Sequence, residues 1–456
     1  MADFESLRKE NPEFLYESFS LTGKESEITL GFRFSLGKTV FTPTTRIKTD
    51  NLNIINAFDS PAARRIAFCL GMAEAVSYWK AACPPTVRVL CGSLSGEDIL
   101  WFKKLWFRGL GEFFYRNGIT TDMDSFVNIV CEGEALPGGG DFVSAWLNII
   151  PVGGGKDSAV TTELLSGFRN KNMFFTVNDQ PARTQCVLAA GYDESRIIKT
   201  YRTIDPNLLE LNRRGYLNGH TPFSAIVAFL SYYCAYLIGA ENIALSNESS
   251  ANEANVGGTG VNHQYSKSYE FEKDFRDFSD GYFGLPIRYF SLLRPFNEAQ
   301  IAKKFAACPQ YLKVFRSCNA GSKKNIWCCN CAKCLFVFIM LSPFVGRGEL
   351  IEAFGCDMLD KADLLVDFEG LCGFSGVKPF ECVGTAREVC AMLELTLRRF
   401  GGVEKPYLLA EYEKRRTPVT SCELRALFGE YNEVNSVGSE FLPAVREMYK
   451  YVSAID

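Results

Sequence analysis

The pattern of hydrophobic and polar residues changes character near residue 146. Before it, polar and β-branched or aromatic residues alternate in some segments, and apolar residues recur at helical spacing in others. The pattern predicts strands at 27–36, 39–47 and 86–92 and helices at 60–82 and 95–118, the first helix opened by a Ser-Pro start signal. We therefore predict an α+β unit over residues 1–145, in which no chemically distinctive motif stands out.

Beyond residue 146, short apolar strands alternate regularly with helices. Strands are predicted at 148–152, 172–178, 196–204 and 242–249, and helices at 157–169, 182–191 and 222–239. Such repetition favours a parallel sheet with right-handed crossovers, whose ligands bind beyond the carboxyl ends of the strands. The glycine loop at 153–155, Asn178 and the polar stretch 246–255 all follow predicted strands. We expect them to line one crevice.

The predicted fold class is therefore α/β. A central parallel-sheet domain occupies 146–345, the α+β unit precedes it, and a mostly helical or irregular region with a glycine-rich loop at 370–384 occupies 346–456. Two apolar runs, 223–240 and 334–345, approach the hydrophobicity of membrane spans. The first is interrupted by serine, tyrosine and glycine and the second is too short, so both predict buried helices.

Composition narrows the class of protein. The chain has 456 residues, 47% of them apolar and 22% charged, as in a soluble protein of two or three domains. The net charge of -4 gives no overall basic signal for nucleic acid or an anionic membrane, and neither is an expected partner. The polar first residues do not resemble a secretory signal, so we expect a cytoplasmic protein whose 17 cysteines are reduced thiols or metal ligands.

The clearest chemical signal is the loop between the strand at 148–152 and the next helix. Gly153, Gly154 and Gly155 precede Lys156, Asp157 and Ser158. Consecutive glycines let the backbone approach a ligand, and unpaired N–H groups at a helix start attract an anion such as phosphate. The Walker pattern fails because Asp157 follows the lysine, and the dinucleotide pattern fails because residue 158 is serine. A tight turn without a ligand is the alternative.

The sequence "GGGKDS" resembles the PP-loop of the ATP pyrophosphatase superfamily, S-G-G-x-D-S, with Gly153 in place of the first serine and its hydroxyl donor. The resemblance implies an adenine nucleotide alpha hydrolase-like domain that cleaves ATP between the α and β phosphates. It implies that residues 153–158 hold pyrophosphate and that Asp157 supports Mg²⁺ or the turn. Asn178 would receive the nucleoside, unless it is a plain turn residue.

A cysteine cluster lies further along the chain. Cys328, Cys331 and Cys334 are spaced so that their thiolates converge, and Cys318 offers a fourth ligand for a tetrahedral zinc site. QueC-type PP-loop enzymes resemble this arrangement. Inert buried thiols, or a reactive thiol activated by the start of a helix, are the alternatives.

The ordered set "PVGGGKDS", "GHTPFSAI", "LSNESSANEANV", "GVNHQYSKSYEFE", "WCCNCAKCLFVFIMLSPF" and "VKPFECVG" resembles the MurL family over about residues 146–385. This family consists of UDP-N-acetylmuramoyl-L-alanyl-L-glutamate epimerases. The resemblance implies that the terminal L-glutamate of UDP-MurNAc-L-Ala-L-Glu is inverted to D-glutamate in peptidoglycan precursor synthesis. The resemblance also implies that the reaction requires Mg²⁺ and consumes ATP, which is released as AMP and pyrophosphate. Adenylation of the α-carboxylate is chemically reasonable because it removes the negative charge beside the Cα proton.

Further site residues follow from the polar segments of this set. Asn247, Glu248, Asn252 and Glu253 are candidates for substrate or metal contacts, or else cap a loop. The chain has only two histidines, so His263, near Lys267, and His220 are the candidates for an imidazole base or phosphate ligand. In the tail, Lys378 and Glu381 are candidates for substrate contacts, and Cys382 is a candidate proton carrier. Lys156 of the glycine loop is a further candidate catalytic residue. A surface turn is the alternative for the tail segment.

Two other functions remain open on the sequence. One is a different PP-loop chemistry, such as amide ligation, deazaguanine synthesis or RNA thiolation. The other is a zinc-bearing scaffold that binds nucleotide without catalysis. The sequence indicates neither the oligomeric state nor the residues that bind UDP.

Overall fold

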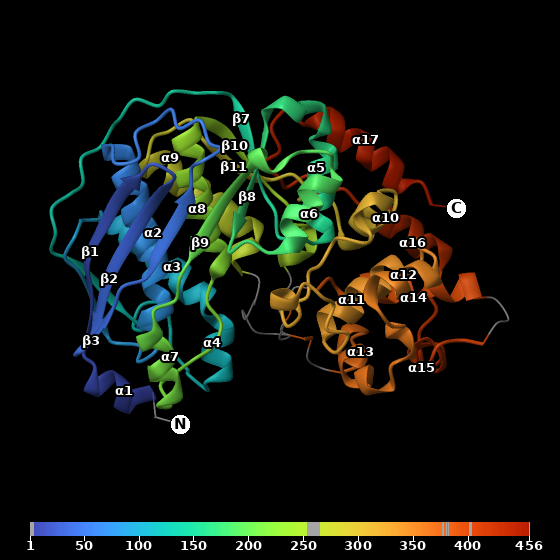
Figure 1. The fold of residues 1–456 in the computed structure, drawn as a ribbon. Helices are drawn as coiled ribbons and strands as arrows, with labels where there is room; N and C mark the ends of the chain where they lie inside the picture. The colour runs from blue at the N-terminus through green and yellow to red at the C-terminus, as the bar shows by residue number, and fades with distance from the viewer. Residues whose placement is uncertain are drawn as a thin grey trace.

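The computed structural model describes residues 4–252, 265–375, 378–379, 381, 383–400 and 404–455. The described strands form one sheet in the order β11-β10-β7-β8-β9-β4-β2-β1-β5-β6, with β3 paired to β2 (Figure 1). The strands are β1 (Glu13–Lys24), β2 (Glu27–Leu36), β3 (Thr39–Phe41), β4 (Thr44–Lys48), β5 (Thr86–Val89), β6 (Asn128–Cys131), β7 (Leu147–Pro151), β8 (Asn172–Val177), β9 (Ile197–Arg202), β10 (Ala240–Leu245) and β11 (Arg288–Ser291).

Helices cover both faces of this sheet and make up most of the chain beyond it. They are α1 (Phe4–Glu10), α2 (Pro61–Trp79), α3 (Gly96–Gly109), α4 (Gly111–Arg116), α5 (Lys156–Leu164), α6 (Pro181–Ala189), α7 (Pro206–Arg213), α8 (Phe223–Ile238), α9 (Tyr269–Tyr282), α10 (Glu298–Ala306), α11 (Ala332–Leu341), α12 (Arg347–Phe354), α13 (Leu365–Leu371), α14 (Ala386–Phe400), α15 (Tyr407–Arg415), α16 (Ser421–Phe428) and α17 (Leu442–Ser453). The prediction of an α/β fold with a helical C-terminal region is confirmed.

The half of the sheet that follows residue 146 is parallel, as predicted. Strands β7, β8, β9, β10 and β11 all pair in parallel. The N-terminal strands join this half through the antiparallel pair of β4 and β9. Both predicted units therefore contribute to one continuous sheet, although the boundary at residue 145 does fall between two strands.

Alternate residues of the parallel strands enter two separate hydrophobic cores. In β7, Ile149 belongs to the core that also contains residues of α2, α3, α8 and α9. Its neighbour Ile150 belongs to the core built with α5, α6, α10 and the C-terminal helices. This is the period of two expected for a strand buried on both faces.

The N-terminal face depends on the close approach of α2 to the sheet. Ser60 caps α2 by accepting a hydrogen bond from the N–H of Ala63 at 3.1 Å. A Cβ atom at Gly71, inside the helix, would lie only 1.9 Å from Tyr16 Oη of β1. Glycine at this position therefore lets the helix pack directly on the strand.

The long apolar segment predicted as a buried helix is α8, which packs between α2 and strands β7 and β10. Within the described residues, no helix has both the length and the apolar character needed to cross a membrane.

Three buried asparagines set the register of the parallel strands. Asn242 of β10 donates to Oδ1 of Asn148 in β7 at 2.9 Å, and Asn148 donates to Oδ1 of Asn172 in β8 at 3.0 Å. We call this row the asparagine ladder. If one strand slipped by one residue against its neighbour, its asparagine would move to the opposite face of the sheet and lose its amide partner. The ladder therefore opposes errors in strand register.

Three predicted segments differ from the structure. The helix predicted at 95–118 is divided into α3 and α4 at Leu110. The strand predicted at 39–47 is divided into β3 and β4 at Pro43, which has no N–H to donate to a sheet. The helix predicted at 157–169 ends as α5 at Leu164 and is followed by a 3-10 segment, Ser166–Lys171. Strands β1, β6 and β11 were not predicted. β1 is exposed over its second half, and the other two have only four residues each, too few for a periodic signal.

Candidate functional site

The glycine loop joins the carboxyl end of β7 to α5, as predicted. Gly154 has a φ of 84°, a left-handed conformation, and Gly155 immediately precedes the helix. The N–H of Arg316, far along the chain, donates to the carbonyl of Gly154 at 2.6 Å. Ser158 Oγ donates to the carbonyl of Gly155 at 3.1 Å. The loop is therefore held from inside its helix and from the segment after α10.

A cavity of about 230 Å³ adjoins Gly153. Its walls include Arg183 and Arg316, and the Nε atom of each is buried without a hydrogen-bond partner among the described residues. A Cβ atom built on Gly153 would meet no described atom within 4 Å. Two arginines beside a helix start make this cavity suited to an anion.

Lys156 lies on the helix side of the loop, buried between two carboxylates. Its Nζ atom donates to Asp157 and to Glu298, at the start of α10. Burial alone would lower the pKa of Lys156, but the two carboxylates outweigh burial and raise it. Lys156 is therefore a permanent cation at neutral pH.

Carboxylates outnumber cations around Lys156. Burial raises the pKa of Glu248, and the charge of Asp157 raises it further. Burial also raises the pKa of Glu298. Glu388, at the start of α14, accepts hydrogen bonds from the N–H of Glu298 at 2.7 Å and from the N–H of Thr385 at 2.6 Å. Glu388, from the C-terminal region, therefore contacts Glu298, the partner of Lys156.

Arg294, just after β11, organises the segment beyond β10. It is fully buried and pairs with Glu272 at 2.9 Å. Its Nη1 atom donates to the carbonyl of Glu248 at 2.6 Å, and its Nη2 atom donates to the carbonyl of Lys267 at 2.8 Å. Glu248 and Lys267, both predicted as substrate residues, are therefore held side by side through their backbones.

Asn178 and Asn247, two other predicted site residues, follow strands β8 and β10. Asn178 has a left-handed φ of 54°, and its Oδ1 atom accepts from the N–H of Arg202 at 2.8 Å, so its side chain closes the end of the sheet. The carbonyl of Asn247 accepts from Ser291 Oγ at 2.6 Å. Both residues lie at the carboxyl edge that carries the glycine loop.

His220 lies in the loop before α8, and its Nδ1 atom is 3.5 Å from Glu112 of α4. The loop is fixed by the buried Lys80, whose Nζ atom donates to Thr221 Oγ1 at 2.6 Å and to the carbonyl of His220 at 3.2 Å. Burial, followed by the charge of Arg202, lowers the pKa of Lys80 to about 8.

The tail segment also approaches the cavity. Glu381 Oε2 accepts a hydrogen bond at 3.2 Å from Asn319, a residue of the cavity wall, and Lys378 is half-buried in the same segment. Glu253, His263 and Cys382 lie outside the described residues, as does the side chain of Asn252.

The four predicted metal ligands converge. The Sγ atoms of Cys318, Cys328, Cys331 and Cys334 all lie within 4.8 Å of one another. Cys318 also lines the cavity beside the glycine loop.

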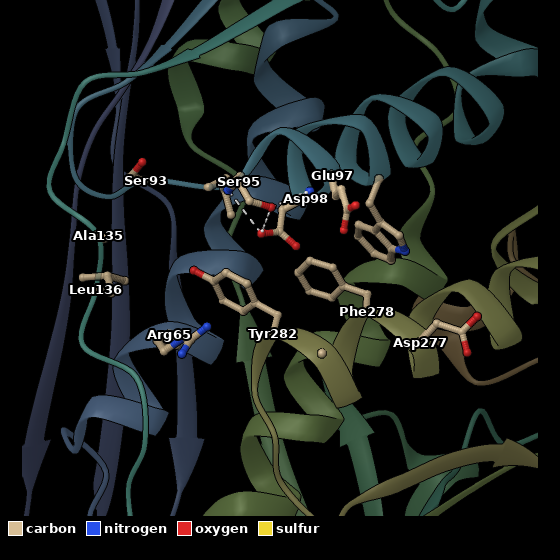
Figure 2. Close-up of a pocket in the computed structure, with 13 residues that line it drawn as sticks. Arg65, Ser93, Ser95, Glu97, Asp98, Ala135, Leu136, Asp277, Phe278 and Tyr282 are labelled. Atoms are coloured by element: carbon tan, nitrogen blue, oxygen red, sulfur yellow. Dashed lines mark hydrogen bonds between the residues drawn. The ribbon is translucent and has the colours of Figure 1, made fainter.

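A larger cavity of about 660 Å³ lies in the N-terminal half, between α3 and α9 (Figure 2). The rings of Phe278 and Tyr282 and the carboxylates of Glu97 and Asp98 line it, and Arg65 stacks on Tyr282 at 4.1 Å. The cavity follows the carboxyl end of β5, which runs opposite to β9 because three antiparallel pairings separate the two strands. This cavity and the glycine loop therefore lie at opposite edges of the sheet.

Comparison with known proteins identifies the family. A model of the MurL N-terminal domain matches residues 5–292, and a model of the MurL C-terminal domain matches residues 314–421. This chain belongs to the MurL family.

Relatives in the family share similarity over most of their length. A protein of Xanthomonas oryzae pv. oryzae is 34% identical over 339 residues, which cover 72% of this chain and 74% of the relative. A protein of Salinispora tropica is 34% identical over 352 residues and covers 76% of each chain. A protein of Micromonospora sp. is 34% identical over 338 residues, 73% of this chain and 74% of the relative. All three are named UDP-N-acetyl-alpha-D-muramoyl-L-alanyl-L-glutamate epimerase.

The cavity beside Gly153, which we call the anion cavity, is lined by residues from both MurL domain matches. Gly153 and Arg183 belong to the N-terminal match, whereas Arg316 and the cysteine cluster belong to the C-terminal match. Sequence reasoning missed Arg183, Arg294, Glu298, Arg316 and Glu388. Single charges inside the apolar segments "LLRPF" and "VFRSC" were the available signal for Arg294 and Arg316.

Proposed function

We propose that this MurL-family protein is an ATP-dependent epimerase. It inverts the terminal L-glutamate of UDP-MurNAc-L-Ala-L-Glu to D-glutamate, a step in peptidoglycan precursor synthesis. The observation that carries the proposal is the shared name of three relatives that match about three quarters of this chain. The cavity beside the glycine loop supports the use of ATP, since its two arginines suit a polyphosphate.

Adenylation explains why an epimerase would consume ATP. The Cα proton beside an ionised carboxylate is very weakly acidic, because the carbanion would lie next to a negative charge. An α-carboxylate oxygen forms a bond to the α phosphorus, the bond to the β-phosphate oxygen breaks, and pyrophosphate leaves. A base then removes the Cα proton and an acid returns one to the opposite face. Water hydrolyses the mixed anhydride and releases AMP and the D-glutamyl product.

The proposal assigns binding roles to the described residues. The N–H groups at the start of α5, with Arg183 and Arg316, hold the pyrophosphate moiety. Lys156, a buried cation, opposes the negative charge that develops during transfer. Bound Mg²⁺ would neutralise phosphate charge. Asp157 and Glu248 are the carboxylates suited to hold it, because the charge of Asp157 helps to raise the pKa of the buried Glu248, and a cation between the two would relieve this repulsion.

The two proton-transfer groups come from a short set of candidates. His220 lies beside a carboxylate, Glu112, in a loop fixed by Lys80. His263 and Cys382 remain the other candidates. Lys156 suits charge stabilisation better than proton abstraction, because its pKa is raised.

Isotope exchange tests the reaction. The full-length protein, ATP and Mg²⁺ are incubated with UDP-MurNAc-L-Ala-L-Glu in deuterated water. We expect deuterium at the glutamate Cα, D-glutamate in the hydrolysed product, and AMP in step with turnover. If AMP formed only with other carboxylates, the protein would be a different adenylating enzyme and not this epimerase. The absence of ATP turnover with any carboxylate would favour a nucleotide-binding scaffold.

Arginine variants test the assignment of the cavity. Arg183→Met and Arg316→Met each remove one buried donor group, and we expect about 10- to 100-fold weaker pyrophosphate binding. Arg33→Met is the matched control, because Arg33 pairs with Glu17 on the exposed N-terminal strands. If all three variants bound pyrophosphate equally well, pyrophosphate would bind elsewhere and not in this cavity.

A further inference from the structure

We propose that Cys318, Cys328, Cys331 and Cys334 bind one zinc ion in a closed four-thiolate site, and that this ion fixes the wall of the anion cavity. The proposal does not depend on the epimerase activity, because it concerns the folding of residues 316–334. These residues join α10 to α11 and contain one short 3-10 turn.

The positions of the sulfur atoms match a single tetrahedral ion. Cys328 Sγ lies 3.7 Å from Cys334 Sγ, and Cys331 Sγ lies 3.5 Å from Cys334 Sγ. Zinc–sulfur bonds of about 2.3 Å place the corners of a tetrahedron roughly 3.8 Å apart. A disulfide would instead require about 2.05 Å between two sulfurs. All four atoms fall within 4.8 Å of one another, which leaves no room among them for a multi-iron cluster.

The backbone is arranged to support thiolates. The N–H of Gly321 donates to Cys318 Sγ at 3.1 Å, and the N–H of Asn330 donates to Cys328 Sγ at 3.4 Å. Such donors stabilise sulfur that carries negative charge, as the outer shell of a metal site does. Cys331 occupies the N-cap position of α11, where the helix dipole also favours an anion. Three separate parts of the segment therefore direct charge-stabilising groups at the cluster.

The degree of burial indicates a structural ion and not a catalytic one. Cys318 and Cys334 are fully buried, and Cys328 and Cys331 are half-buried. With four protein ligands the ion has no open position for water or substrate, the arrangement typical of structural zinc. Thiolate ligands also select zinc over magnesium or calcium.

The same segment forms one side of the anion cavity. Arg316, Ser317 and Asn319 line the cavity together with Cys318 itself. Residues 317–331 contain no strand and no α-helix, so few backbone hydrogen bonds hold them in place. A metal cross-link between Cys318 and the start of α11 would therefore replace secondary structure as the support for Arg316 beside Gly154.

Metal content tests the site directly. The full-length protein is purified without chelators, and its zinc is measured by mass spectrometry; we expect about one ion per chain. Replacement by Co²⁺ should give the intense visible bands of tetrahedral cobalt with thiolate ligands. Protein that folds, accepts less than about 0.1 zinc per chain when zinc is supplied, and shows only octahedral cobalt bands overturns the proposal.

Cysteine variants locate the ion. Cys331→Ser should lower the zinc content at least about tenfold. Cys329→Ser is the matched control from the same turn, because Cys329 Sγ lies outside the cluster and donates to the carbonyl of Phe354 at 3.2 Å. We expect it to retain the ion. Equal zinc loss in both variants, with circular dichroism unchanged, would contradict the assigned ligands.

Proteolysis separates this proposal from the proposed function. Removal of zinc should increase cleavage within residues 316–334, and readdition should restore protection. That result would stand even if the protein proved unable to turn over ATP. Unchanged cleavage after complete removal of zinc would overturn the role of the ion in fixing the cavity wall.

Discussion

Two adjacent glycines of the loop should respond oppositely to the same substitution. Gly154 has a φ of 84°, and an added Cβ would lie 3.2 Å from the Cβ of Ala182. Gly153 has no left-handed φ, and its added Cβ would enter the cavity without touching a described atom. Gly154→Ala should therefore destabilise the fold, whereas Gly153→Ala should leave the fold intact and obstruct the anion.

The magnitudes follow from backbone conformation. A left-handed alanine costs about 1–2 kcal/mol, and the contact with Ala182 adds to this cost. Gly153→Ala should instead stabilise the protein by about 0.5 kcal/mol, because alanine reduces the entropy of the unfolded chain. We thus expect a difference of about 2 kcal/mol in the free energy of unfolding between the two variants.

Urea denaturation measures the unfolding free energies, and calorimetric titration measures pyrophosphate binding. Gly153→Ala should bind pyrophosphate at least about tenfold more weakly while remaining folded, since the added methyl group would take up space in the cavity proposed to hold the anion. Equal stability of the two variants would refute the left-handed conformation of Gly154. Normal binding by Gly153→Ala would refute the placement of the anion in this cavity.

Three further substitutions test buried polar groups by urea denaturation. Lys156→Met should cost about 3–5 kcal/mol at pH 8, because it leaves carboxylates unpaired, and less at pH 5. The folded variant keeps a proton on Glu298, whose pKa burial already raises, and loses stability as the pH rises; a cost independent of pH would contradict this. Asn148→Leu should cost about 2–4 kcal/mol, since the side-chain NH2 group of Asn242 and Oδ1 of Asn172 lose their partners in the asparagine ladder; a neutral effect would mean that water replaces the Asn148 side chain. Burial lowers the pKa of Lys80 to about 8, so wild type should gain about 3 kcal/mol relative to Lys80→Met between pH 8 and 10.5, where unfolding takes up a proton. A flat difference over that window would show that Lys80 stays charged when folded.

The sequence by itself determined the local features of this protein. The helical spacing of apolar residues identified α2, a long apolar run identified α8, and short apolar strands that alternate with helices identified the parallel half of the sheet. The glycine loop was identified where "NIIPV" ends. The spacing of the cysteines also predicted three of the four converging sulfurs within one short segment. These features depend on neighbours within a few residues, which is the range over which propensity and periodicity act.

Only the tertiary structure decided which distant residues meet. Lys156 and Glu298 are 142 positions apart, and Arg316 reaches Gly154 across 162 positions, so no local pattern relates them. Nor could the sequence show that β4 pairs with β9 and merges the two predicted units into one sheet. Such contacts form because burying a charge or a strand edge requires a partner, and the partner's place in the chain is set by the packing of whole elements.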